Sequence, residues 1–413
     1  MNAGIRSSLG SLLTLSVLFF APTWAAAQAG SLDPSFGNGG IVTTDFGDQI
    51  NGNKASAAAI AIQSDGKILV CGGVPSSTGF PVAAVERYNT DGSVDTSFGS
   101  SGIVTTPQLA VPSAITLQAD GKIVVAGPIE GVELDVARYL PNGTLDSTFA
   151  TGGIFTSGLN LGSAAPASAI VIQPDGKILV ADGILLRLLS DGQTDPSFGS
   201  GGEATIVGRS ATALALLPNG KILTTSSVGQ ISRYLPNGSL DTSFGVNGQL
   251  ASPGPINAMV LLSTGTFLVD GSLITSISEQ NTGFALFRYL PTGVADATFA
   301  RHGGVVTSIP TFSTASASAF ALQSSGDVVM LGTANNSAAS PVFALARYTP
   351  SGQLDTTFGT GGTVATSLGT GTLTAPALAI QPDGKIVAAA GFTTTVPHGE
   401  FDTGFKLARY LGQ

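Results

Sequence analysis

Short runs of alternating apolar and polar side chains recur along the chain. Residues 59–70 show the pattern, with an alternating run, the turn Asp65–Gly66 and a second apolar run. A period of two predicts β-strands, and Asp-Gly between such runs is the strongest local hairpin signal, because both turn positions need positive φ. The same turn position recurs at Asp120–Gly121, Asp175–Gly176, Asn219–Gly220, Thr264–Gly265, Ser325–Gly326 and Asp383–Gly384. The sequence therefore predicts seven hairpins.

Two further strands follow each hairpin. The first ends in Arg-Tyr, at Arg87, Arg138, Arg233, Arg288, Arg347 and Arg409, with Arg187–Leu188 as the deviant copy. A Leu-Asp-x-x-Phe-Gly linker and a short β-branched strand come next, and the linker aspartates are Asp33, Asp95, Asp146, Asp195, Asp241, Asp296 and Asp355. Four short strands in roughly 55 residues, without a helical period, are typical of a β-propeller blade.

We therefore predict an all-β, seven-bladed propeller of four-stranded antiparallel blades, formed by residues 30–413 as one domain. The repeat begins in mid-unit at residues 31–37 and ends just after Arg409–Tyr410–Leu411. We expect the N-terminal strand, at about residues 40–44, to become the outermost strand of the last blade. Closing the ring in this way leaves no open terminal sheet edge.

The repeated units resemble the delta-60 repeat family of secreted and surface bacterial proteins. The resemblance rests on sequences such as AAIAIQSDGKILVCG, FALARYTPSGQLDTTFG and GGIVTT, and it covers nearly all of residues 30–413. It implies a propeller-like repeat without an assigned activity. The function must therefore be argued from the residues.

Residues 1–29 have the features of a signal peptide. Arg6 supplies a positive charge, residues 9–20 are apolar, and small residues near position 27 offer a cleavage site. No later stretch reaches about 18 uninterrupted apolar residues, so we expect no transmembrane segment. The predicted location is secreted, either extracellular or periplasmic.

Composition excludes several classes of protein. The 413 residues include 43% hydrophobic residues, 10% charged residues and one Cys, which argues against a disordered tail and against a disulfide scaffold. A net charge of -9 argues against a nucleic-acid partner. With only His302 and His398, a His-rich metal site cannot be built. No cofactor is predicted, although a divalent cation stays an open alternative.

The Arg, Asp and Phe that recur once in each unit are expected to pack and pin the blades. One hypothesis pairs each Arg with the linker Asp through bidentate hydrogen bonds. The alternative is that each Asp caps its own turn through backbone N–H groups.

The two faces of the predicted ring should differ. Loops after the first and third strands carry the repeated turns and linkers, whereas the loops near residues 72–79, 272–283, 333–341 and 393–404 vary. Variable loops on a rigid scaffold are where a binding surface is expected. The candidate ligand-binding residues there are Asp182, Asp270, Glu279, His398, Glu400 and Asp402. Asp182 and Asp270 are expected to point at the mouth of the central channel.

The preferred hypothesis is an exported, non-enzymatic binding or scaffold protein that presents these loops to a protein or glycan partner. We expect it to be a monomer. The alternative is a propeller hydrolase or lyase that uses carboxylates, with or without a divalent cation, at the channel mouth.

Overall fold

The computed structural model describes residues 28–49, 54–77, 80–109, 111–129, 133–158, 169–208, 211–276, 281–336, 340–395 and 401–413. The signal peptide predicted for residues 1–29 falls outside these ranges, apart from its last two residues. Across the described ranges, no helix has the length and apolar character needed to span a membrane.

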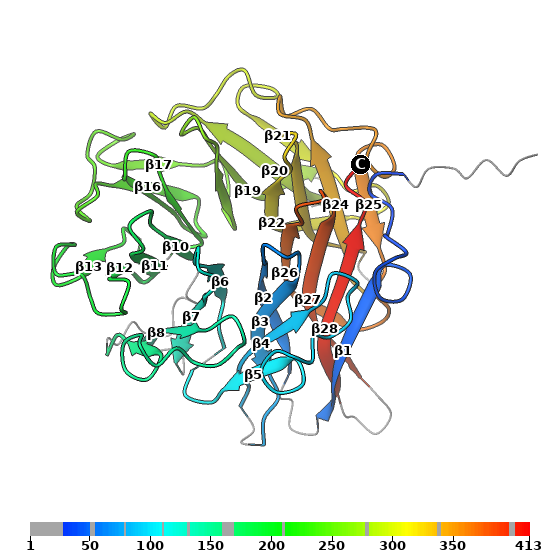
Figure 1. Ribbon diagram of the computed structural model, residues 1–413. Coiled ribbons are helices and arrows are strands. Elements are labelled where there is room, and N and C mark those ends of the chain that lie inside the picture. Colours follow the sequence, from blue (N-terminus) through cyan, green and yellow to red (C-terminus); the bar gives the residue numbers. More distant parts are fainter. Residues whose placement is uncertain are drawn as a thin grey trace, which may run out of the picture.

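The described residues form seven four-stranded antiparallel sheets, the blades, arranged in a ring (Figure 1). Blade 1 contains β2 (Ser56–Ile62), β3 (Ile68–Val74), β4 (Val82–Tyr88) and β5 (Ile103–Thr106). Blade 2 contains β6 (Ala114–Leu117), β7 (Ile123–Ile129), β8 (Glu133–Tyr139) and β9 (Ile154–Thr156). Blade 3 contains β10 (Ala169–Ile172), β11 (Ile178–Asp182), β12 (Ile184–Leu188) and β13 (Glu203–Thr205).

The later blades repeat this order. Blade 4 contains β14 (Ala213–Leu216), β15 (Ile222–Thr225), β16 (Gln230–Tyr234) and β17 (Gln249–Ala251). Blade 5 contains β18 (Met259–Leu261), β19 (Phe267–Ser276), β20 (Asn281–Tyr289) and β21 (Gly304–Thr307). Blade 6 contains β22 (Thr314–Leu322), β23 (Val328–Asn335), β24 (Val342–Tyr348) and β25 (Thr363–Thr366). Blade 7 contains β26 (Thr372–Ile380), β27 (Ile386–Thr395), β28 (Phe401–Tyr410) and β1 (Ile41–Gln49).

The N-terminal strand closes the ring, as predicted. β1 pairs antiparallel with β28 from Ile41 opposite Ala408 to Gln49 opposite Phe401, so it is longer than the strand expected at residues 40–44. The first strand of each blade contacts the first strand of the next blade, and β2 of blade 1 contacts β26 of blade 7. The seven-bladed propeller is therefore confirmed.

The core lies in the seams between neighbouring blades. The linker phenylalanines have at most 1% of their surface exposed, and these are Phe36, Phe98, Phe149, Phe198, Phe244, Phe299 and Phe358. Fully burying a side chain of this size contributes about 1.5–3 kcal/mol. The repeated Phe thus packs each blade against its neighbour, as the sequence indicated.

The hairpin turns differ from the predicted type. In the first hairpin, Gly66 has φ of 83°, whereas Asp65 does not have a positive φ. The Gly66 N–H donates to the Gln63 carbonyl, and the Gln63 N–H donates to the Lys67 carbonyl, both at 2.9 Å. The loop is therefore a type I turn followed by glycine in the left-handed region. Asp65 stabilises the turn through its side chain, because its Oδ1 accepts a hydrogen bond from the Lys67 N–H at 3.1 Å.

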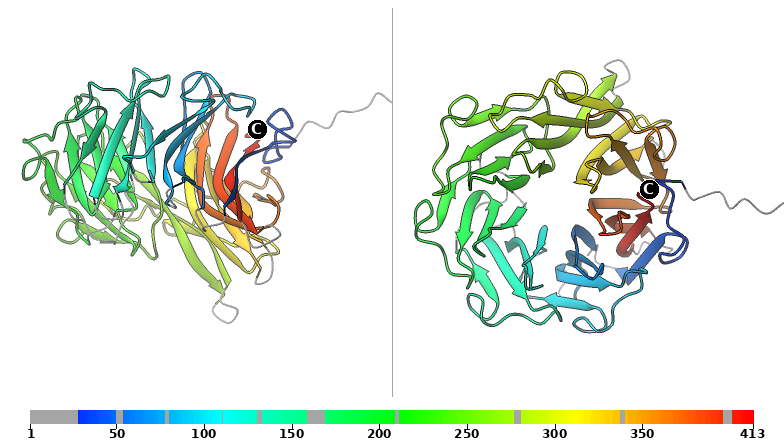
Figure 2. Two further views of the ribbon diagram at one scale, coloured as in Figure 1. Left: turned by 90° about the horizontal axis from the view of Figure 1, so that it is seen from below. Right: turned by 45° about the horizontal axis from the view of Figure 1, so that its top comes forward.

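We call the side that carries the turns after first strands and the linkers after third strands the repeat face. The opposite side, which carries the connections after second and fourth strands, is the variable face. The blades extend to different heights on the variable face, because their strands differ in length. β27 and β28 each have 10 residues, whereas β10 has 4 and β11 has 5. In the left view of Figure 2, the strands of blade 5 extend further than those of blades 2 to 4.

Candidate functional site

On the repeat face, each recurring Arg forms a staple with the linker that follows it. In blade 1, Arg87 Nε donates to Asp95 Oδ2 at 2.8 Å, and the guanidinium lies 4.5 Å from the centre of the Phe98 ring. Asp95 Oδ1 accepts two hydrogen bonds from Ser97, from its N–H at 3.1 Å and its hydroxyl at 2.6 Å. The Arg pairing and the turn cap thus coexist on different oxygens. The predicted bidentate geometry is wrong, because Oδ1 is already used by the cap.

The same guanidinium joins neighbouring blades. Arg87 Nη1 donates to the Pro141 carbonyl of blade 2 at 2.6 Å. Equivalent bonds run from Arg138 to Ser190, Arg187 to Pro236, Arg233 to Pro291, Arg288 to Pro350, Arg347 to Gly412 and Arg409 to Thr90. The last of these returns to blade 1. The repeated arginines therefore form a continuous belt around the ring, which is a structural role.

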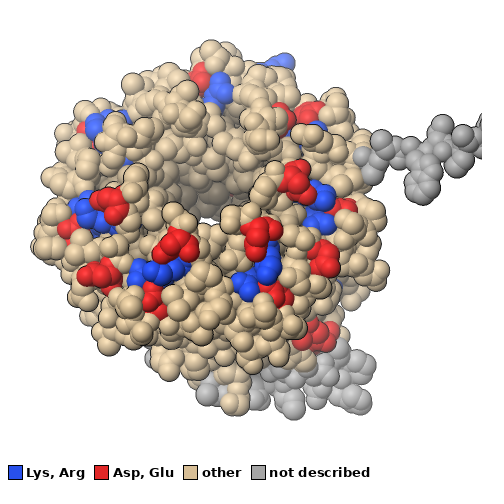
Figure 3. All heavy atoms as spheres, in the orientation of Figure 1, with Lys and Arg blue, Asp and Glu red and all other residues tan. Residues whose placement is uncertain are grey.

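Lysines of the hairpin turns add to the staples. Lys67, Lys122, Lys177, Lys221 and Lys385 lie 2.8–3.8 Å from the Oδ2 atom of a linker aspartate. Burial opposes the ionisation of Asp146, but hydrogen bonds from Thr148 and the charges of Arg138 and Lys122 outweigh it and lower its pKa to about 2. Figure 3 shows these cations and carboxylates gathered in clusters around the central opening. These lysines and aspartates therefore pair with one another within the fold.

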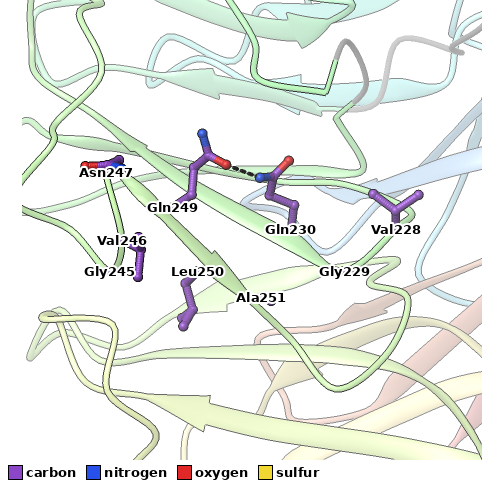
Figure 4. Close-up of a pocket in the computed structure, with 9 residues that line it drawn as sticks. All are labelled: Val228, Gly229, Gln230, Gly245, Val246, Asn247, Gln249, Leu250 and Ala251. Carbon is purple, nitrogen blue, oxygen red and sulfur yellow. Dashed lines mark hydrogen bonds between the residues drawn. The ribbon is translucent and has the colours of Figure 1, made fainter.

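One hollow of about 700 Å³ runs along the outer strand of blade 4 (Figure 4). It is lined by Val228, Gly229, Gln230, Gly245, Val246, Asn247, Gln249, Leu250 and Ala251. Gln230 Nε2 donates to Gln249 Oε1 inside it. The lining residues include no charged side chain and no nucleophile, so the hollow offers shape but no acid–base chemistry.

Asp270, a predicted ligand-binding residue, is 1% exposed and lies in the seam between blades 5 and 6. Its Oδ1 accepts the N–H groups of Asn257 at 3.2 Å and Ala258 at 2.5 Å, and its Oδ2 is buried without a hydrogen-bond partner. Burial raises the pKa of Asp270 to about 7, against the lowering effect of these two bonds. The expectation that it points at the channel mouth is wrong, because this side chain caps the start of β18.

Asp182 is also 1% exposed, at the end of β11. Its Oδ1 accepts the Gly183 N–H at 2.7 Å, and burial raises its pKa to about 6. Neighbouring β11 side chains Ile178 and Val180 pack on blade 2, which places this face of the strand in a seam. For Asp182, too, the expected position at the channel mouth is wrong. Whether either aspartate binds a ligand stays a prediction.

Of the four remaining candidates, the structure describes Asp402. Glu279, His398 and Glu400 are outside the described residues. Asp402, in β28, is partly buried, and its charge raises the pKa of Lys406 while burial, the larger effect, lowers it. Lys406 Nζ lies 4.7 Å from the centre of the Phe392 ring. At the neighbouring edge, Lys54 Nζ lies 4.8 Å from the centre of the Phe401 ring. The described side chains around Asp402 therefore include two lysines, each placed over a phenylalanine ring.

Two further buried acids belong to the seams. Asp135 is a β8 residue with 0% exposure, and burial raises its pKa to about 7. Glu86, in β4, is 3% exposed and was missed by the sequence analysis. The usable signal was the comparison of repeats, since the other units have Ala, Leu, Ser or Phe at its position.

The described side chains do not favour a metal-binding site. Within the described ranges, no group of three or more His, Cys, Asp or Glu side chains could hold a metal ion. Cys71 is buried, and burial raises its thiol pKa to about 12, which disfavours the reactive thiolate.

Comparison with known proteins supports the fold. A family described as "Domain of unknown function (DUF5122) beta-propeller" matches residues 63–98, 118–149, 173–198, 217–244 and 323–358. These segments run from a hairpin turn to the linker Phe, which supports a β-propeller repeat family. The delta-60 name itself stays a prediction. No curated protein matches the chain.

Solved propellers have the same architecture. The WD40 propeller domain of Doa1 is 10% identical, with a TM-score of 0.51 over 92% of this chain and 97% of that chain. The RRP9 WD40 repeats are 10% identical, with a TM-score of 0.52 over 92% of this chain and 99% of that chain. At this identity the similarity shows the fold alone.

Proposed function

We propose that the protein is an exported, non-enzymatic binding or scaffold protein that presents its variable face to a protein or glycan partner. The observation that carries the proposal is the contrast between the two faces. On the repeat face, every motif Arg is paired with a linker Asp in the same geometry. The variable face has side chains and strand lengths that differ from blade to blade.

The variable face carries exposed apolar side chains, as the repeat face does at Val246 and Val294. Phe80 follows β3 and is 77% exposed, and Ile274 near the end of β19 is 63% exposed. Large apolar side chains in such positions are typical anchors for a partner, because burying them on binding releases ordered water. Blades 1 and 5 therefore supply the first contacts that we would test.

Export is part of the same proposal. It rests on the leader-like sequence of residues 1–29. Edman sequencing of protein recovered outside the producing cell should begin near residue 28 or 30. Recovery of the uncleaved chain from the cytoplasm alone would contradict export.

The binding surface can be tested with a panel of glycans and extracellular proteins. Residues 30–413 are applied to the panel, and each hit is measured by calorimetry. We expect Phe80→Ser and Ile274→Ser to weaken binding at least about tenfold, the loss typical of a central contact residue.

Val294→Ser is the matched control. Val294 is 62% exposed and follows the third strand of blade 5, on the repeat face. This variant should bind normally. Weaker binding by Val294→Ser, with Phe80→Ser and Ile274→Ser unaffected, would place the function on the repeat face.

A further inference from the structure

The seams can be compared with one another, because each is built from the same repeat. In the seam between blades 1 and 2, the Tyr139 hydroxyl pairs with Thr106 Oγ1 at 2.7 Å. In the seam between blades 7 and 1, the Tyr88 hydroxyl pairs with Thr44 Oγ1 of β1, also at 2.7 Å. We call this second interface the closing seam, because there β1, near the N-terminus, and β28, near the C-terminus, meet blade 1.

The closing seam contains a carboxyl group at a position where the other units have none. Glu86 precedes the motif Arg, and its Oε2 accepts a hydrogen bond from the Tyr88 hydroxyl, with 2.5 Å between the two oxygens. The corresponding residues in the other units are Ala137, Leu186, Ser232, Phe287, Ala346 and Ala408. The hydrogen bond between Tyr and Thr is thus extended to an acid only where the ring is closed.

The surroundings of Glu86 are apolar. The side chains that form the closing seam include Val42 and Phe46 of β1 and Phe405 of β28, together with Ala84 and Tyr88 of blade 1. This environment disfavours a negative charge, because a carboxylate loses its hydration without gaining a cation.

The charged groups packed around the closing seam have other partners. At its repeat-face end, Arg409 pairs with Asp33 at 2.9 Å. At its variable-face end, Lys54 lies over the Phe401 ring. Lys406 of β28 donates to the Leu368 carbonyl, on the side of blade 7 that faces blade 6.

Asp45 of β1 alternates with Thr44 and Phe46, which face blade 1, and its Oδ1 accepts the Gly47 N–H at 2.7 Å. On blade 1 itself, Arg87 and Lys67 pair with Asp95 on the far side of β4. The groups that act on Glu86 are Tyr88 and Thr44, both neutral.

We propose that the closing seam is a proton-controlled latch, which holds β1 against blade 1 while Glu86 keeps its proton and loosens when Glu86 ionises. Burial raises the pKa of Glu86 from 4.5 to about 7, and the hydrogen bonds from Tyr88 and Thr44 only partly oppose this. When β1 leaves, water reaches the carboxyl group and its pKa returns towards 4.5.

The direction of the pH dependence follows from the pKa of Glu86 in the closed state and in the open state. A pKa that is higher in the closed state means that closure is favoured fully below about pH 4.5 and that this advantage is lost as the pH rises to about 7. A difference of about 2.5 pKa units corresponds to an opening equilibrium constant that increases up to about 300-fold across this range. Above pH 7 the constant should level off.

Hydrogen exchange of residues 30–413 between pH 4 and 8.5, corrected for intrinsic exchange rates, tests the latch. Amides of β1 should lose up to about 300-fold in protection relative to the same amides in Glu86→Gln. Gln keeps an acceptor for Tyr88 and does not titrate, so its β1 protection should stay flat across this range. Glu86→Ala is the second variant, because three other units have Ala there.

Two controls isolate the effect. Asp135→Asn removes a buried acid from the neighbouring seam and should leave the pH dependence of β1 unchanged. Amides of β13, in the seam between blades 3 and 4, should keep their protection while β1 opens. Equal pH dependence in the original chain and both Glu86 variants would overturn the proposal, as would a parallel loss of protection in β13, which would indicate global unfolding.

Discussion

Removing one charge from a staple should strongly destabilise the ring. In blade 2, Arg138 Nε lies 2.8 Å from Asp146 Oδ2, and the two side chains are only 5% and 4% exposed. Asp146→Asn keeps an oxygen to cap Thr148 but leaves the Arg138 guanidinium buried without its counter-charge. Breaking a buried ion pair in this way typically costs about 3–5 kcal/mol. We expect a loss of that size in the free energy of unfolding.

Urea denaturation of residues 30–413, followed by circular dichroism, measures this loss without adding salt. Asp120→Asn is the matched control, because Asp120 pairs with Lys122 at 3.1 Å but its side chain is 55% exposed. It should cost less than about 1 kcal/mol. The combined change Arg138→Met and Asp146→Leu should cost less than Asp146→Asn alone, because no charge is left unpaired. If Asp146→Asn is no more costly than Asp120→Asn, the staple does not stabilise the seam as argued.

Three further predictions test closure, burial and backbone geometry. Deleting residues 31–44 removes the first four residues of β1, which pair with residues 405–408 of β28, so this part of the β28 edge is exposed and the melting temperature should fall cooperatively; an unchanged melting curve would contradict closure. Asp270→Asn should raise the melting temperature at pH 8 but not at pH 4, because a buried acid with a pKa of about 7 loses its stabilising effect as the pH rises from about 4 to 7; an equal effect at both pH values would refute this. Gly293→Ala should cost more than Gly152→Ala in the free energy of unfolding, since both have positive φ but only at Gly293 would a Cβ meet the Phe244 ring, at 2.7 Å; equal losses would show that the seam adapts.

The blades could be predicted from the sequence because their signals are local and repeated. Strand alternation, turn glycines such as Gly66 and the linker phenylalanines are set by neighbouring residues, and seven copies average out exceptions. The turn type was wrong for a local reason. The sequence Asp-Gly is compatible with a two-residue turn and with a three-residue turn that ends in a left-handed glycine. The hydrogen bond from the Gln63 N–H to the Lys67 carbonyl distinguishes the second from the first.

The candidate site was harder to predict because it depends on how the blades face one another. Alternation shows that Asp182 and Asp270 lie in strands, but in a propeller both faces of the second and third strands pack against neighbouring blades. A charged residue there can be buried on either side. Glu86 was missed for a related reason. Thr44 is in the outer strand of blade 7 and Glu86 is in blade 1, so the two side chains meet only when the ring is closed.

The central claim is that partners contact the variable face and that the repeat face holds the ring together. Photo-cross-linking in the producing cell tests it most directly, with a photoreactive amino acid placed at Phe80, Ile274 or Thr394 and, for comparison, at Asp120, Val294 or Ser351. Thr394 is near the variable-face end of β27, and Ser351 follows β24 on the repeat face. We expect covalent adducts from the first three positions alone. Adducts formed mainly from the last three positions would contradict the account, as would an absence of adducts from Phe80, Ile274 and Thr394.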